Sequence, residues 1–355
     1  MSVKINIRYI RWIILLLLLG GIGYIKYSPL AGEKYARTFY PFLSNILSNF
    51  SSFFPFSVGD VLIYGSIIGL LVYWIYVVFK RRSKIVALIR VSEYLLWIYV
   101  WFYLTWGLNY FRQDFYTRLD IPREHYSADV FLPFLKSYTE ALNSSFVSIE
   151  KIDKKLVANE VKREYAEIAD RFVLPSPPDY LHPKPMLIPS LMSGTGVLGY
   201  IGPFFIEHNL NPDLLPVQYP FTYAHEMAHV LGISSEAEAN LFGFLVCSRS
   251  QVPEIRFAAY FALLPYVLSN AHTLLPEKEF AEWRATLSTE VKNLYNQKNR
   301  YWQTLYNPLI GDWQEKLYGW FLKQNNIPTA QKNYSEVIGL LIAVYANPDL
   351  LSACG

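Results

Sequence analysis

Charged residues, cysteine and histidine are all scarce in this sequence. Charged residues make up 17% of the 355-residue chain and apolar residues 52%, which is more apolar and less charged than an ordinary soluble protein. The net charge is only +3 and no basic stripe is interleaved with aromatics, which argues against nucleic-acid binding. The two cysteines, Cys247 and Cys354, provide neither a disulfide framework nor a CxxC metal site. Cys247 lies in an apolar run, which predicts a buried thiol.

Long apolar segments, by contrast, dominate the first third of the chain. We expect three transmembrane helices, at about residues 9–27, 61–79 and 91–111. Val61 to Phe79 is a run of 19 residues without a charge, and Tyr94 to Phe111 is a run of 18. Both runs are long enough to cross a hydrocarbon core of about 30 Å. Residues 1–111 are therefore predicted to form a membrane region, and the lipid bilayer is an expected partner.

The first apolar segment is open to two interpretations. Its uninterrupted part, Trp12 to Ile25, has only 14 residues, but Arg11 and Lys26 can snorkel and let it span. The alternative is a signal peptide, with a charged start before its apolar part. No A-x-A-like cleavage site follows the segment, which favours an uncleaved anchor.

Basic residues predict the orientation. They precede the first segment and follow the second at Lys4, Arg8, Arg11, Lys80, Arg81, Arg82 and Lys84, whereas the intervening residues 28–60 contain only Lys34 and Arg37. The positive-inside rule then places the N-terminus and the loop at 80–90 in the cytoplasm, and everything after residue 112 outside it. The stretch Phe39 to Phe56 is rich in Phe and Leu but interrupted by polar residues, so we expect it to lie along the outer interface.

Residues 112–355 have the mixed pattern of one globular domain. Met186 to Asn211 is rich in glycine and β-formers and predicts two or three short strands. The apolar spacing predicts helices at 127–144, 154–173, 219–231, 235–248, 253–270, 276–298, 312–325 and 333–346. The apolar runs at 257–268 and 336–346 are too short to span a membrane, so we assign them to the core. The fold class is therefore mainly α, with three transmembrane helices followed by an α+β domain.

One motif carries chemistry. Residues 225–229 read HEMAH, and on a helix His225 and His229 share one face and can bind one tetrahedral Zn²⁺. Glu226 lies beside that face and is predicted to be the general base that takes a proton from the attacking water. Pro220 suits the first turn of this helix, and Gly232 suits its left-handed end. The alternative is two ordinary polar residues on a surface helix.

A catalytic zinc site needs a third protein ligand. Glu236 and Glu238 both follow within ten residues of His229, in the segment SEAEAN. Ser235 is a good N-cap, and Glu238 stands at the capping-box position three residues later, which leaves Glu236 as the preferred ligand and Glu238 as the alternative. Asn240 lies one turn beyond Glu236 and is predicted to orient a ligand histidine.

The segment PFTYAHEMAHVLGISSEAEANLFGFLVC resembles the signature of an uncharacterised bacterial family of membrane-anchored HExxH proteins, known only as a domain of unknown function. The stretches PFSVGD at 55–60, WGLNYFR at 106–112 and IEHNLN at 206–211 also match it. The likeness covers nearly the whole chain. It implies three N-terminal spans, a zincin-like domain with an HExxH active-site helix, and a bacterial inner-membrane location. It implies no substrate.

The E-x-x-A-[DN] element is also similar to the third-ligand helix of glutamate-type zincins, including the CAAX-processing membrane peptidases. In those proteins the first Glu binds zinc, which matches Glu236. The sequence departs from most of them because only seven residues separate His229 from Glu236, so the second helix must fold back almost at once. In metzincins the third ligand is a His six residues beyond the HExxH motif, with a Gly between them. This sequence has the Gly, at Gly232, but Ser235 in place of that His, and Gly232 can supply the same sharp turn.

Supporting residues are less defined by the sequence. Zincins present substrate along an edge strand before the active-site helix, and Gly199 to Glu207 is the candidate here. Glu207, with Asn209 and Asn211, either lines the cleft or shapes a turn. The donor that stabilises an oxyanion is open among three residues, Tyr266, His272 and Tyr301.

These features predict a zinc metallopeptidase that cleaves peptides or proteins near the membrane on its extracytoplasmic side. A second hypothesis is a zinc hydrolase of non-peptide amides in the cell wall. A third is a non-catalytic sensor or scaffold that retains a zinc site, although the intact Glu226 argues against it. The sequence does not indicate the oligomeric state.

Overall fold

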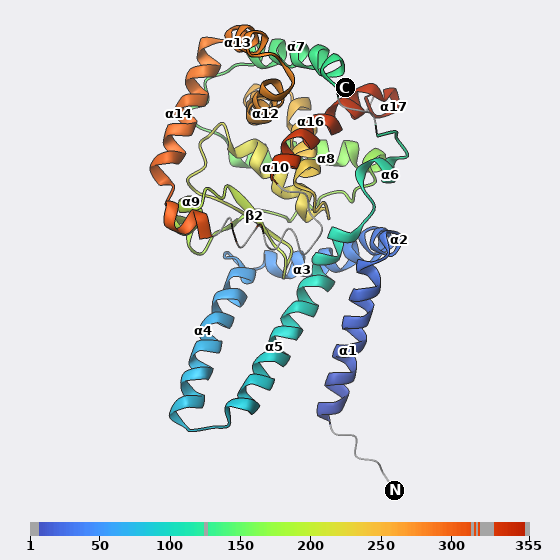
Figure 1. The fold of residues 1–355 in the computed structure, drawn as a ribbon, viewed down its shortest axis with the longest axis vertical. Coiled ribbons are helices and arrows are strands. Elements are labelled where there is room, and N and C mark those ends of the chain that lie inside the picture. The colour runs from blue at the N-terminus through green and yellow to red at the C-terminus, as the bar shows by residue number, and fades with distance from the viewer. Residues whose placement is uncertain (1–6, 124–126, 314–315, 317–318, 320–329, 352–355) are drawn as a thin grey trace. The chain divides into compact units, whose positions relative to one another are not determined.

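The computed structural model describes residues 7–123, 127–313, 316, 319 and 330–351 (Figure 1). It divides into two units: residues 1–113 with Gly202–Glu207, and residues 114–201 with 208–355. We describe each unit by itself. The boundary after residue 113 lies two residues beyond the predicted one, after residue 111. Nothing in the sequence pattern indicated that Gly202–Glu207 would join the first unit.

Three helices of the first unit are long and apolar enough to cross a membrane: α1 (Ile7–Lys26), α4 (Val58–Phe79) and α5 (Lys84–Thr105). The three predicted apolar helices are therefore confirmed. Helix α5 packs on both α1 and α4. Ser57 and Ser83 cap the last two helices, because their hydroxyls accept hydrogen bonds from Asp60 N and Val86 N.

The predicted bounds of the third span are wrong. The helix begins at Lys84, seven residues before the predicted start, and a 3₁₀ turn (η2, Gly107–Phe111) replaces its predicted end. The predicted span began just after Arg90, but Arg90 lies inside α5, as does Glu93. Glu93 is tolerated there because it forms an ion pair with Arg11 of α1.

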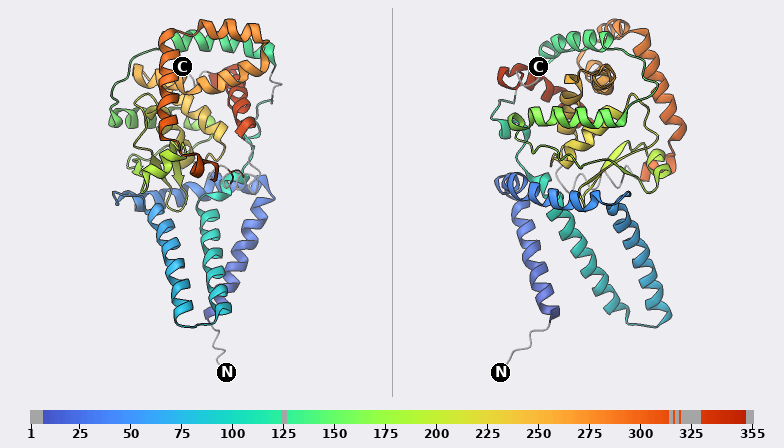
Figure 2. Two further views of the ribbon diagram at one scale, coloured as in Figure 1. Left: turned by 60° about the vertical axis from the view of Figure 1, so that its left-hand side comes forward. Right: turned by 180° about the vertical axis from the view of Figure 1, so that it is seen from behind.

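Short helices connect α1 to α4: α2 (Pro29–Lys34), a π-helical turn η1 (Tyr35–Phe39) and α3 (Tyr40–Ser52). Within this unit α3 runs across the direction of the three long helices (Figure 2). It exposes the apolar side chains Phe42, Ile46 and Phe50, spaced four residues apart on one side. Such an exposed apolar stripe is typical of a helix that lies in a membrane interface.

The hairpin segment Gly202–Glu207 belongs to this first unit through Glu207. The Glu207 carboxylate accepts hydrogen bonds from Val58 N (3.0 Å), Gly59 N (2.8 Å) and the Ser57 hydroxyl (3.2 Å). It thus satisfies free N–H groups at the start of α4, where a negative charge is stabilising. A side chain on Gly59 would lie 3.1 Å from this carboxylate, so the helix start is close-packed.

The second unit is helical apart from one small sheet. Its helices are α6 (Phe115–Leu119), α7 (Ala128–Ser144), α8 (Lys154–Phe172), α9 (Pro189–Gly194), α10 (Tyr219–Val230), α11 (Glu236–Arg249), α12 (Pro253–Leu274), α13 (Glu277–Thr286), α14 (Thr289–Leu305), α16 (Ala330–Ala346) and α17 (Pro348–Leu351). The three strands are β1 (Lys184–Pro185), β2 (Gly199–Gly202) and β3 (Glu207–Leu210), in the order β1-β3-β2. Strands β1 and β3 are parallel, with Lys184 opposite Asn209.

Helix α11 is the centre of this unit. Every residue from Ala237 to Cys247 is buried, and the helix packs against α8, α10, α12 and α16. The buried Cys247 thiol is confirmed, as are core positions for the apolar runs of α12 and α16. Because α11 has no exposed face between Ala237 and Cys247, packing on all sides fixes the side chains of this part of the helix.

One prediction for this unit is wrong. The single helix expected at 276–298 is two helices, because the chain becomes extended at Leu287 and Ser288, and the Ser288 hydroxyl caps α14. The range Met186 to Asn211 contains two of the short strands expected there, β2 and β3, and also the helix α9, whose first residue is the helix-starting Pro189. Most of the helix predicted at 312–325 lies outside the described residues.

Candidate metal centre

The three predicted ligands lie together at the junction of α10 and α11. His225 Nε2 is 3.2 Å from His229 Nε2 and 3.2 Å from a Glu236 carboxylate oxygen, and His229 Nε2 is 3.8 Å from the other Glu236 oxygen. All three donor atoms lie within 4.8 Å of one another. Donors placed about 2.0–2.1 Å from one tetrahedral zinc ion stand about 3.3 Å apart, so these separations fit a zinc site.

The chain reversal between the two helices is local in origin. After His229, the N–H of Gly232 bonds to the His229 carbonyl (3.0 Å), and the N–H of Ile233 bonds to the Ala228 carbonyl (3.1 Å). This is a Schellman motif, which needs a left-handed residue, and Gly232 has φ of 89°. The Ser235 hydroxyl then accepts a bond from Glu238 N and starts α11. The predicted helix end at Gly232 and N-cap at Ser235 are confirmed.

Each histidine is held by its second ring nitrogen. His225 Nδ1 lies 2.9 Å from Asn240 Oδ1, and His229 Nδ1 lies 2.6 Å from the Ile233 carbonyl. Both partners are acceptors, so each Nδ1 carries a proton and each Nε2 faces the cluster. Asn240 is itself fixed, because its amide nitrogen donates to the Tyr266 hydroxyl at 2.9 Å.

The electrostatics of the cluster differ from one residue to the next. Burial opposes the charged form of His229, but its hydrogen bond to Glu236 and that carboxylate's charge outweigh burial and raise the pKa of His229 to about 9. Burial would likewise raise the pKa of Glu236, but hydrogen bonds from the two imidazoles hold it well below its ordinary value. Glu236 therefore carries a negative charge across the physiological pH range.

Glu226 points to a different part of the site. It is 4% exposed, and its Oε2 atom has no hydrogen-bond partner among the described residues. Burial raises the pKa of this carboxyl, although the neighbouring His225 and His229 oppose the shift. A side chain on Gly199 would lie 2.6 Å from Glu226 Oε1, so only glycine lets the backbone of β2 come this close.

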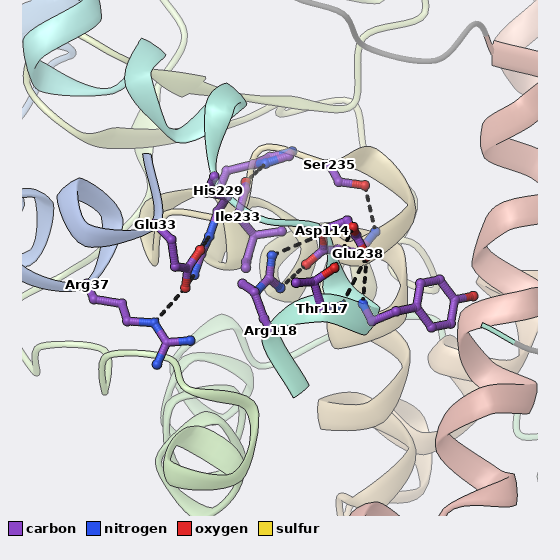
Figure 3. A network of polar contacts seen from close by, with 11 residues as sticks. Glu33, Arg37, Asp114, Thr117, Arg118, His229, Ile233, Ser235 and Glu238 are labelled. Atoms are coloured by element: carbon purple, nitrogen blue, oxygen red, sulfur yellow. Dashed lines mark hydrogen bonds and ion pairs between the residues drawn. The ribbon is translucent and has the colours of Figure 1, made fainter. Parts of the chain in front are cut away.

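Glu238 lies in an apolar pocket on the same turn of α11. It does not complete the expected capping box: its carboxylate forms a two-point ion pair with Arg118 of α6 (Figure 3). The side chains of Arg118 and Glu238 are only 1% and 9% exposed. Arg118 was not predicted, since nothing near it in the sequence indicates a partner 120 residues away.

The remaining candidates have other contacts. Glu207 lies at the start of α4, and we leave it out of the proposed site. Asn211 shapes a turn, with its amide bonded to the Val197 carbonyl at 2.8 Å. The Tyr301 hydroxyl donates to the Asp213 carbonyl at 2.9 Å, and the exposed His272 packs edge-on against Phe280.

Two contributors had no signal in the sequence pattern. The Ile233 carbonyl that holds His229 is a backbone atom, and any residue could supply it. Gly199 could have been singled out only by knowing that β2 passes beside Glu226. The three candidate ligands themselves were identifiable because they lie within 12 residues on two adjoining helices.

Comparisons with known proteins give a family and no function. No curated protein and no solved structure matches the chain. One family model matches residues 35–342, which include the last two apolar helices, the sheet and the whole His225–Glu236 cluster. The chain therefore belongs to the family described as "Protein of unknown function (DUF3810)".

Proposed function

We propose that this protein is a membrane-anchored zinc metallopeptidase. His225, His229 and Glu236 would hold the ion, and Glu226 would act as general base. The observation that carries the proposal is the spacing of the three donor atoms, 3.2, 3.2 and 3.8 Å apart, which suits one tetrahedral ion. The cluster has the composition of a catalytic rather than a structural zinc site, since three protein ligands leave the fourth position open.

The surroundings of the ligands support the fit. Asn240 and the Ile233 carbonyl hold both imidazoles with Nε2 toward the cluster, where it can bind a metal once the proton on His229 is displaced. Glu236 supplies a negative charge and is 34% exposed at its side chain, whereas the His229 side chain is 6% exposed. The ligand set is therefore rigid on its inner side and accessible at Glu236.

A bound zinc ion supplies a Lewis acid that polarises the scissile carbonyl and lowers the pKa of water toward about 7. The residues of the chain supply the proton transfers. Glu226 accepts a proton from the attacking water and holds it on a carboxyl whose pKa is raised by burial. It then delivers that proton to the leaving nitrogen.

A peptide substrate is favoured by the strand beside Glu226. Strand β2 is at the edge of the sheet, and its first residue, Gly199, is in close approach to the Glu226 carboxyl. An extended peptide can add to such an edge through backbone hydrogen bonds. This would bring its amide bonds past Glu226, a geometry that a branched sugar amide would not use. The cell-wall amide hydrolase and the non-catalytic scaffold remain as outcomes of the test below.

The test uses the full chain purified in detergent, with zinc measured per chain and turnover measured on a pool of peptides. We expect one zinc per chain in wild type and Glu226→Gln, turnover only in wild type, and no zinc in His229→Ala. Loss of the base should lower turnover by about 10²- to 10⁴-fold. Glu279→Gln, on the exposed face of α13, is the matched control and should behave as wild type.

Each contrary result has one meaning. Turnover by Glu226→Gln at the wild-type rate would refute the mechanism. A full zinc content in His229→Ala would refute the ligand assignment. Zinc without cleavage of any peptide would favour the scaffold, and cleavage of cell-wall amides alone would favour the second enzyme hypothesis.

We also propose that the metal site faces away from the cytoplasm. The basic residues at Lys80–Lys84 favour a cytoplasmic position for the loop between α4 and α5. With three spans, residues after 112 then lie outside. A phosphatase reporter, which is active only in an oxidising, extracytoplasmic location, should be active when fused after Gly355. Activity of a cytoplasmic reporter fused at the same site would contradict the topology.

A further inference from the structure

Helices α4 and α5 leave a groove between them. It has a volume of about 540 Å³, and its lining from α4 extends from Val61 to Tyr73. Twelve residues of helix rise by about 18 Å, so the groove runs along much of the length of the pair. Most of its lining is apolar, and the polar groups are Ser66, Tyr73, Tyr94 and Arg90.

Two glycines keep the groove open. A side chain added at Gly65 or Gly69 would meet no atom of the described protein within 4 Å. These glycines therefore do not serve a close contact between α4 and α5. Beside them, the Ser66 and Tyr94 hydroxyls are bonded to each other at 2.6 Å and bridge the two helices. The space over the glycines is thus available to a molecule from outside the chain.

Arg90 gives this apolar groove a positive charge. It lies six residues after Lys84, about 9 Å along α5, and its side chain is exposed. The only carboxylate of α5, Glu93, is paired with Arg11 of α1. Arg90 forms no ion pair within the described part of the chain. A cation inside an apolar helix is costly unless an anion accompanies it or it snorkels to the interface.

More positive charge lies next to the end of the groove that Arg90 occupies. The loop between the two helices carries Lys80, Arg81, Arg82 and Lys84, all exposed. Basic residues beside a membrane helix attract anionic lipid, with about 1 kcal/mol for each residue near the surface. The charge of this end therefore complements an anionic headgroup, and the apolar length of the groove complements a hydrocarbon chain.

We propose that the groove binds an anionic phospholipid of the leaflet that contains the 80–84 loop. One acyl chain lies along Gly65 and Gly69, and the phosphate pairs with Arg90. A helix from a second copy is the other occupant that a G-x-x-x-G pattern suits. The charge decides between them, because a packed apolar helix would cover Arg90 without supplying an anion.

The experiment measures lipids retained by the full chain after reconstitution into vesicles of phosphatidylglycerol and phosphatidylcholine in a 1:3 ratio. Native mass spectrometry in mild detergent then counts each lipid per chain. We expect wild type to retain phosphatidylglycerol in preference to phosphatidylcholine. Arg90→Gln should lower that retention about fivefold, which corresponds to about 1 kcal/mol, without changing the phosphatidylcholine signal. Gly65→Leu and Gly69→Leu should each lower the retention of both lipids.

Two controls match these changes. Gly20→Leu puts the same side chain on α1, where nothing lies within 4 Å, and Lys278→Gln removes an exposed charge of α13, outside both the groove lining and the 80–84 loop. Both should retain lipid nearly as wild type does. The leucine variants are expected to fold, since they add a better helix former in open space. If thermal unfolding shows that one leucine variant is not folded, the other leucine variant and Arg90→Gln still test the proposal.

The proposal is overturned by any of three results. These are the absence of any preference for phosphatidylglycerol in wild type, retention of phosphatidylglycerol by Arg90→Gln at the wild-type level, and unchanged lipid retention by the two leucine variants. A wild-type dimer that Gly69→Leu converts to a monomer would assign the groove to a second copy instead.

Discussion

Two polar regions lie on either side of the first turn of α11, and they are satisfied in different ways. On one side, Glu238 pairs with Arg118 through two hydrogen bonds, and both side chains are almost fully buried. On the other, Glu236 faces two imidazoles at 3.2 and 3.8 Å. The two carboxylates are two residues apart, but the first has a permanent cation as its partner and the second has groups that can be neutral.

The type of partner separates structure from chemistry. A guanidinium stays charged at any physiological pH, so the Arg118–Glu238 pair is complete and needs no further ligand. Imidazoles can lose their proton, and once neutral they leave the charge of Glu236 without a compensating cation and offer lone pairs of their own. The first kind of contact also occurs in the first unit, where Glu93 is paired with Arg11. We therefore treat the first kind of contact as structural and the second as a metal site.

The largest expected effect tests the structural side of this comparison. Glu238→Gln leaves Arg118 buried without a charge partner and should lower the free energy of unfolding by about 3–5 kcal/mol. Replacing both partners with apolar residues, Arg118→Met with Glu238→Leu, should recover much of that loss. Thermal unfolding of the full chain in detergent measures both.

The exposed pair Lys278–Glu282 provides the control. Its side chains are 87% and 66% exposed, so Glu282→Gln should change stability by no more than about 0.5 kcal/mol. If Glu238→Gln were as mild as this control, the pair with Arg118 would not be the structural element that the comparison requires.

The second prediction separates the two glutamates by metal binding. Glu236→Gln should weaken zinc binding by more than about a hundredfold, beyond the 10- to 100-fold typical of residues that only orient a ligand. Glu238→Gln, measured well below its unfolding temperature, should bind zinc as wild type does. Competition with a chromogenic chelator gives both affinities. A larger loss for Glu238→Gln than for Glu236→Gln would reverse the assignment of the third ligand.

The features that could be predicted from the sequence are those set by neighbours along the chain. The end of α10 at Gly232 and the start of α11 at Ser235 follow from a Schellman motif and an N-cap, each made by residues a few positions apart. These two local signals also place Glu236 seven residues after His229 and against it. The site was therefore predictable because it is local.

The features that could not be predicted depend on long-range contacts. The capping-box spacing correctly predicted the bond from Glu238 N to the Ser235 hydroxyl. It wrongly predicted the partner of the Glu238 carboxylate, which is Arg118, 120 residues earlier. Charge counting set the start of the third span too late because it left out Arg90, which lies inside α5 three residues before Glu93, the partner of Arg11. One sequence gives residue types but not the partners that decide their cost.

The third prediction concerns pH. In the metal-free protein the pKa of His229 is about 9, so this residue holds a proton below pH 9 that zinc must displace. Zinc affinity should therefore rise by about tenfold for each pH unit between pH 7 and 9, about a hundredfold in all, and level off above. Chelator competition across this range, with proton release followed in buffers of different ionisation enthalpy, measures the effect. An affinity that is constant from pH 7 to 9 would show that His229 is already neutral, and that Glu236 does not hold its charge beside it.

The smallest effect concerns the hydrogen bond behind His225. Asn240→Leu removes the acceptor for Nδ1 and should weaken zinc binding by about tenfold, the lower end for a residue that orients a ligand. Asn240→Asp keeps an acceptor and should restore binding, which a simple packing defect would not permit. Tyr266→Phe acts only through the Asn240 amide and should cost less, whereas the control Tyr301→Phe, whose hydroxyl bonds to the Asp213 carbonyl, should cost nothing. If Asn240→Leu bound zinc as tightly as wild type, His225 would be held by α10 alone, and the contribution of α11 to the metal site would reduce to Glu236.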